Sequence, residues 1–123
     1  MTGPRTLACF AALNGAMAVA IGAFAAHGAG PAIKSLLTTG AHYQMVHAVL
    51  ALICVVWPAR GSLVVVAGWL AAVGGLVFAL ALSSIGLFGL SVMGAVAPIG
   101  GALMIAAWLL LSFAALRSQS TFA

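Results

Sequence analysis

Long apolar stretches alternate along the chain with short breaks of glycine, proline and polar residues. A helix rises about 1.5 Å per residue, so about 20 apolar residues cross a hydrocarbon core that is about 30 Å thick. The pattern predicts helices at about residues 6–26, 40–57, 62–82 and 98–116. Unbroken apolar runs lack the alternation of barrel strands, and only helices or closed barrels satisfy the backbone in lipid. We therefore predict an all-α membrane protein, a four-transmembrane-helix bundle that forms one integral membrane domain over residues 1–123.

The breaks between these stretches predict loops of different character. We expect the first loop, Gly28 to Thr39, to hold a short interfacial helix at about residues 31–37. The third loop, Ser83 to Ala97, is apolar for a loop. We expect it to lie at the interface or to dip into the bundle, where protein must cover any non-helical backbone.

Three residues are predicted to mark helix ends. His27 is placed to complement the C-terminus of the first helix, and Gly28 to end that helix in the left-handed conformation. Pro98 is predicted to open the last helix, because a missing N–H is harmless at the first helical position.

Composition and charge support a membrane location and narrow the chemistry. Apolar residues make up 66% of the chain and charged residues 3%, with four Lys or Arg and no Asp or Glu. A soluble domain carries about 25% charged residues. Without carboxylates there is no Asp or Glu general base and no carboxylate cage for Ca²⁺ or Mg²⁺. No nucleophile–base pair can be assembled either, so we expect no enzymatic activity, no cofactor and no bound metal.

The few cations predict an orientation. Arg5, Arg60 and Arg117 share one side of a four-helix topology, and only Lys34 lies on the other. Cytoplasmic loops carry the excess of Lys and Arg, so we expect both termini in the cytoplasm and the protein in the cell inner membrane. The basic residues form no cluster that could follow a phosphate backbone, so we expect the lipid bilayer and no nucleic acid as partner.

Polar residues in two apolar stretches form the candidate site. Asn14 lies nine residues after Arg5, and His47 ten before Trp57, which gives depths of about 13 and 15 Å. We expect Asn14 and His47 to be neighbours, directly or through water, with Tyr43 and Gln44 completing an intramembrane polar cluster. The imidazole is interpreted as a neutral, hydrogen-bonded link between helices. Proton or substrate handling, or metal or haem ligation, are the alternatives.

The residues above resemble domain-of-unknown-function family 423, which includes eukaryotic transmembrane protein 256. The matching segments are GAFAAHG at 22–28, TGAHYQMVHAVLAL at 39–52, Gly74-x-x-x-Phe78, and APIGG at 97–101 followed by Trp108. The resemblance marks as motif positions His27, Tyr43, Gln44, His47, Pro98, Gly100 and Gly101. This chain departs from the family pattern at Ala79-Leu80-Ala81 and at Ala97, and both departures remove polar groups. The resemblance implies an inner-membrane protein and no activity.

These features favour a non-enzymatic packing, assembly or accessory subunit. The expected partners are other subunits of a larger membrane complex or further copies of this chain. The alternative is a small oligomeric transporter or channel for an anion or a neutral solute, because four helices are too few to enclose a pathway alone. A histidine-based metal or haem module is a weaker alternative, because the histidine spacing matches no established ligand pattern.

Overall fold

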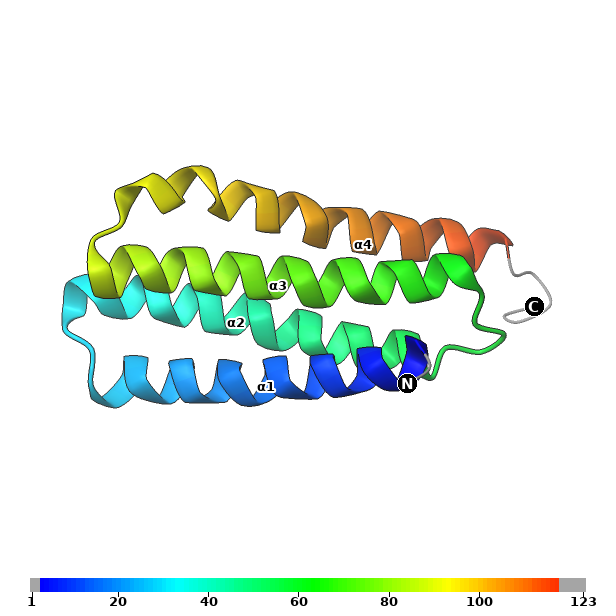
Figure 1. The fold of residues 1–123 in the computed structure, drawn as a ribbon, viewed down its shortest axis with the longest axis horizontal. Coiled ribbons are helices and arrows are strands. Elements are labelled where there is room, and N and C mark those ends of the chain that lie inside the picture. The colour runs from blue at the N-terminus through cyan, green and yellow to red at the C-terminus, as the bar shows by residue number, and fades with distance from the viewer. Residues whose placement is uncertain (1–2, 118–123) are drawn as a thin grey trace.

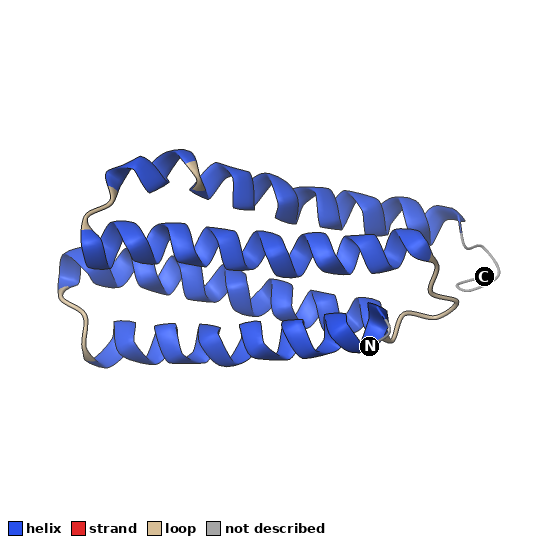
Figure 2. Ribbon diagram, viewed as in Figure 1, coloured by secondary structure: helices blue, strands red, loops and turns tan. Residues whose placement is uncertain are grey.

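The computed structural model describes residues 3–117, and within them four long helices lie side by side (Figures 1 and 2). They are α1 Gly3–His27, α2 Pro31–Val55, α3 Ser62–Phe88 and α4 Ala97–Arg117, with a short 3-10 helix, η1 Ser91–Ala95, before α4. Each of the four is long and apolar enough to cross a membrane. The predicted all-α, four-transmembrane-helix bundle is therefore confirmed.

α2 begins at Pro31 rather than at Gly40, so the predicted loop with a separate interfacial helix is wrong. Gly30 caps α2 in an extended conformation, with φ −71° and ψ 165°, and Pro31 follows in the first turn. The apolar pattern measures the part of a helix that lies in lipid. The backbone goes on making helical hydrogen bonds beyond that part, through the polar residues of the first turns.

The third loop is also shorter than predicted, because α3 continues through Ser83 and Ser84 to Phe88. Gly89 ends α3 with φ 66°, and it is the one glycine with a positive φ among residues 3–117. Its N–H donates to the carbonyl of Ile85 at 3.1 Å, and Leu90 N–H donates to Ser84 at 3.3 Å. This is the left-handed helix ending that glycine favours.

The left-handed ending predicted at Gly28 is therefore wrong. The N–H groups of Gly28 and Ala29 both donate to the carbonyl of Phe24, at 2.7 and 3.1 Å, without a positive φ. A Cβ at Gly28 would lie 2.7 Å from a ring carbon of Phe24, so a larger residue there would have to displace this exposed ring. His27 is the last residue of α1, and its side chain is exposed.

α2 and α3 form the centre of the bundle, and α1 and α4 lie at its two outer edges (Figure 1). α1 packs mainly on α2, α4 packs mainly on α3, and α1 has only a small contact with α3. α1 starts and α4 ends at the same end of the bundle (Figure 1). This arrangement leaves one side of α4 and one side of α1 without a protein neighbour in the described part of the chain.

Small residues bring these helices close together, as expected where lipid provides little hydrophobic driving force. A stripe of small residues along α3 is buried throughout, at Ala67, Ala71, Gly75 and Ala79. α3 and α4 approach most closely at a pair of glycines. A Cβ at Gly100 would lie 2.7 Å from the Phe78 nitrogen and 2.8 Å from the Gly74 carbonyl oxygen.

Candidate intramembrane polar site

The first polar contact joins α1 to α2. The side-chain Nε2 of Gln44 donates to Oδ1 of Asn14 at 2.8 Å, and Asn14 Nδ2 donates to the carbonyl of Phe10 at 3.1 Å. Gln44 is 1% exposed and Asn14 3% exposed. Both side chains therefore lie inside the protein, where their N–H groups find acceptors that lipid could not supply. Gln44 Oε1 is buried and has no hydrogen-bond partner among residues 3–117.

The second polar contact joins α2 to α4 through His47. Its Nδ1 lies 2.7 Å from the carbonyl oxygen of Tyr43, one helical turn earlier, and the indole Nε1–H of Trp108 donates to His47 Nε2 at 3.0 Å. An indole N–H only donates and a carbonyl only accepts. Nδ1 therefore carries the proton and Nε2 presents its lone pair to Trp108, so the imidazole is neutral.

This arrangement leaves the imidazole without a free lone pair. A second proton or a metal ion would have to take Nε2 from Trp108 and leave the indole N–H without its hydrogen-bond partner. A lost hydrogen bond costs about 0.5–1.5 kcal/mol. The geometry therefore favours the neutral, hydrogen-bonded link over proton transfer or metal ligation.

Asn14 and His47 make no direct hydrogen bond, because both ring nitrogens of His47 have other partners. Asn14 pairs with Gln44 instead. The polar residues form two separate contacts, one from α2 toward α1 and one from α2 toward α4. Helical spacing places Gln44 and His47 on the same side of α2, but it does not say which neighbouring helix each one meets.

Tyr43 differs from the other predicted site residues because its side chain is 46% exposed. Its ring lies nearly parallel to that of His47, with centroids 6.4 Å apart, and edge-on to Phe78 at 5.3 Å. No residue among 3–117 hydrogen-bonds its hydroxyl. Tyr43 contributes its carbonyl to His47 and presents its ring to the surface of the bundle.

Trp108 is the site residue that the sequence reasoning missed. A signal was present, because an indole N–H in the middle of a spanning helix needs a partner. Only the packing of α4 on α3, with its position relative to α2, identifies that partner as His47.

Glycines in α3 and near the start of α4 allow the helices that carry the site to approach one another closely. Gly100 and Gly74 allow α3 and α4 to approach, and Gly75 does the same for α2. A Cβ at Gly75 would lie 3.3 Å from the Gln44 Cα and 3.4 Å from the His47 Cβ. Pro98 lies in the first turn of α4, which begins one residue earlier than predicted, and is exposed.

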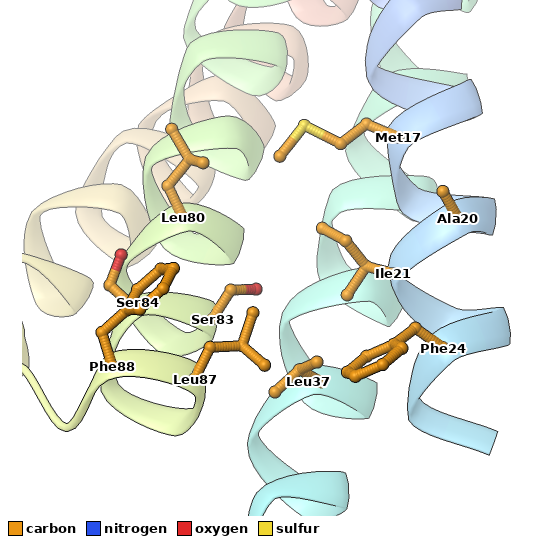
Figure 3. Close-up of a pocket in the computed structure, with 10 residues that line it drawn as sticks. All are labelled: Met17, Ala20, Ile21, Phe24, Leu37, Leu80, Ser83, Ser84, Leu87 and Phe88. Atoms are coloured by element: carbon orange, nitrogen blue, oxygen red, sulfur yellow. The ribbon is translucent and has the colours of Figure 1, made fainter. Parts of the chain in front are cut away.

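A separate apolar cavity of about 370 Å³ lies between α1 and α3, where these helices make little contact (Figure 3). Met17, Ile21 and Phe24 face it from α1, and Leu80 and Leu87 from α3. Ser83 also lines this cavity, and its buried hydroxyl has no hydrogen-bond partner among residues 3–117. Apart from its two serines the lining is apolar, so the residues that line this cavity include no acid, base, histidine or cysteine.

Four spanning helices with buried polar links between them define an integral membrane protein. The family described as "Protein of unknown function (DUF423)" matches residues 21–101, and the chain belongs to this family. The family resemblance read from the motifs is thus confirmed.

The relatives of this chain are bacterial membrane proteins of similar length. The UPF0382 membrane protein YwdK of Bacillus subtilis (strain 168) is 34% identical over 114 residues, covering 86% of this chain and 92% of the relative. A UPF0382 membrane protein of Haemophilus influenzae is 32% identical over 116 residues, covering 89% and 92%. UPF0382 membrane protein SAB0533 of Staphylococcus aureus (strain bovine RF122 / ET3-1) is 38% identical over 111 residues, covering 86% and 91%. No solved structure gives a significant match.

Proposed function

We propose that this protein is a non-enzymatic packing, assembly or accessory subunit of the cell inner membrane, with both termini in the cytoplasm. The observation that carries the proposal is the state of His47. Both of its ring nitrogens are hydrogen-bonded within the protein, so the one histidine inside the bundle is committed to holding α2 against α4. Asn14 and Gln44 hold α1 against α2 in the same way.

The shape of the bundle supports a role in association. α4 lies at an outer edge and exposes a row of large apolar side chains. Lipid can cover this row, but so can a helix of another subunit, because helix packing in membranes depends on van der Waals fit and not on expelling water. The row contains Ile99, Ile105, Leu109, Phe113 and Leu116.

The test is purification of the tagged protein from native membranes in a gentle detergent, with the mass and stoichiometry of the complex measured. We expect a stoichiometric complex with other membrane proteins. A Leu109→Trp variant should lose it, because Leu109 is 66% exposed on the outer face of α4. Leu13→Trp is the matched control, since Leu13 is 64% exposed on α1, and this variant should keep the complex.

Two results would contradict the proposal. Recovery of a homo-oligomer alone would support the small oligomeric transporter or channel instead. Retention of the partner by the Leu109→Trp variant would show that the outer face of α4 is not the binding surface.

A further inference from the structure

A second cavity, of about 380 Å³, opens on the side of the bundle where α2, α3 and α4 meet. Its walls are the rings of Tyr43, Phe78 and Trp108, and the side chains of Met104 and Ile105 also line it. Ile105 is 62% exposed and Trp108 49% exposed. The cavity is therefore open toward the lipid, and an occupant would enter from the membrane.

The walls of this cavity are flat and aromatic. His47 and Trp108 meet edge to face with centroids 6.0 Å apart, Tyr43 stacks along His47, and Phe78 meets Tyr43 edge to face. Together these contacts form a continuous aromatic wall across three helices. Such a wall favours a planar ring, which can stack on one face and meet another edge-on.

One polar group at this cavity lacks a partner. Tyr43 lies on α2 three residues after Gly40, where the apolar stretch of this helix begins. Its hydroxyl makes no hydrogen bond to residues 3–117. An occupant that accepts a hydrogen bond from this hydroxyl therefore gains affinity.

Gly101 keeps the cavity open. The neighbouring Gly100 must be glycine because α3 leaves no room for a Cβ. A Cβ at Gly101 would meet nothing within 4 Å, so packing of the bundle does not require glycine there. Gly101 lines the cavity, and a larger side chain at this position would fill it.

We propose that this cavity binds the ring of a lipid-soluble quinone from the membrane. The walls select a planar ring, and the Tyr43 hydroxyl donates to a ring carbonyl. The absence of a charged lining residue and the neutral His47 select an uncharged molecule. A sterol fits less well, because its saturated, puckered rings cannot stack flat on an aromatic wall.

The test uses the fluorescence of Trp108, which lines the cavity. The chain has three tryptophans, so a Trp57→Phe/Trp69→Phe parent leaves Trp108 alone. This parent is reconstituted in phosphatidylcholine vesicles and titrated with decylubiquinone. We expect quenching that saturates near one quinone per protein, whereas a quinone that only diffuses in the lipid quenches without saturation.

Three variants of this parent separate the cavity from the surrounding membrane. Gly101→Leu should abolish the saturable quenching, and Tyr43→Phe should weaken binding about five- to tenfold, the loss of one hydrogen bond. Gly15→Leu is the matched control, because a Cβ at Gly15 on α1 also meets nothing within 4 Å. It should bind like the parent, and circular dichroism should show equal helicity in all variants.

Four outcomes would overturn the proposal. The first is quenching of the parent that does not saturate. The second is binding by both Gly101→Leu and Tyr43→Phe that equals binding by the parent. The third is displacement of the quinone by cholesterol as effectively as by another quinone. The fourth is a disulfide between two copies of Ile105→Cys that blocks quinone binding, because a second copy of the chain would then occupy this face.

Discussion

The hydrogen bond between Trp108 and His47 can be removed with little change of shape by Trp108→Phe. The substitution keeps an aromatic ring on α4 and deletes the indole N–H, which lies 3.0 Å from His47 Nε2. His47 is 4% exposed, so water has little access to Nε2 once the indole N–H is removed. The variant therefore leaves a buried acceptor unpaired in a low-dielectric interior.

The expected loss of stability follows from this geometry. Hydrogen bonds between membrane helices average about 0.6 kcal/mol in double-mutant cycles and reach about 1.7 kcal/mol. A bond of normal length to a buried acceptor belongs in the upper half of that range, so we expect Trp108→Phe to cost about 1–1.5 kcal/mol. His47→Leu should cost about 1–2 kcal/mol, and the two changes together should cost less than their sum.

The assay is a double-mutant cycle on the free energy of unfolding, measured by titration with sodium dodecyl sulfate in mixed micelles and followed by circular dichroism. Trp69→Phe is the matched control. Trp69 stacks on Phe10 at 5.5 Å but has no hydrogen bond to another described residue through its indole. It measures the cost of a smaller ring alone.

The cycle would refute our reasoning in either of two ways. The first is a coupling energy between Trp108 and His47 below about 0.3 kcal/mol, which is at the level of additivity error. The second is a control variant that loses as much stability as Trp108→Phe, since ring size would then account for the effect.

Two further predictions concern the close helix crossing and the second polar contact. Gly100→Ala should destabilise the bundle by about 1–3 kcal/mol, because its Cβ would meet backbone atoms of α3 at 2.7 and 2.8 Å. Gly101→Ala should stay within about 0.5 kcal/mol of wild type in the same unfolding titration, and equal losses at the two positions would contradict this account. Asn14→Leu should cost about 1 kcal/mol by leaving Gln44 Nε2 without its acceptor, and adding Gln44→Leu should restore part of that stability. A larger loss in the double variant would show that the two amides do not act as a pair.

Helix ends were the least predictable part of the fold. Hydropathy located all four spans, yet it placed the start of α2 at Gly40 instead of Pro31 and the end of α3 at Leu82 instead of Phe88. Both errors have one cause, because hydropathy reports contact with lipid whereas a helix ends where its backbone loses partners or turns left-handed. Gly28 and Gly89 look alike in the sequence, but only Gly89 has the left-handed conformation.

The polar residues of the site were predictable one by one, and their partners were not. Asn14, Gln44 and His47 stood out because a polar side chain in an apolar span must be buried and hydrogen-bonded. Burial of all three follows that rule. The donor to His47 comes from Trp108, sixty-one residues away in the chain, and no periodicity within α2 refers to it.

The sequence by itself determined the membrane location, the number of spans and the identity of the buried polar residues. Each of these depends on transfer between water and lipid, which every segment undergoes largely on its own. The tertiary structure alone decided that Asn14 pairs with Gln44, that Trp108 fixes the tautomer of His47, and that Gly101 faces open space while Gly100 faces α3. Those outcomes depend on how four nearly uniform apolar helices rotate and slide against one another. The relative rotation and translation of the helices depend in turn on close backbone approach and on a few hydrogen bonds between residues far apart in the chain.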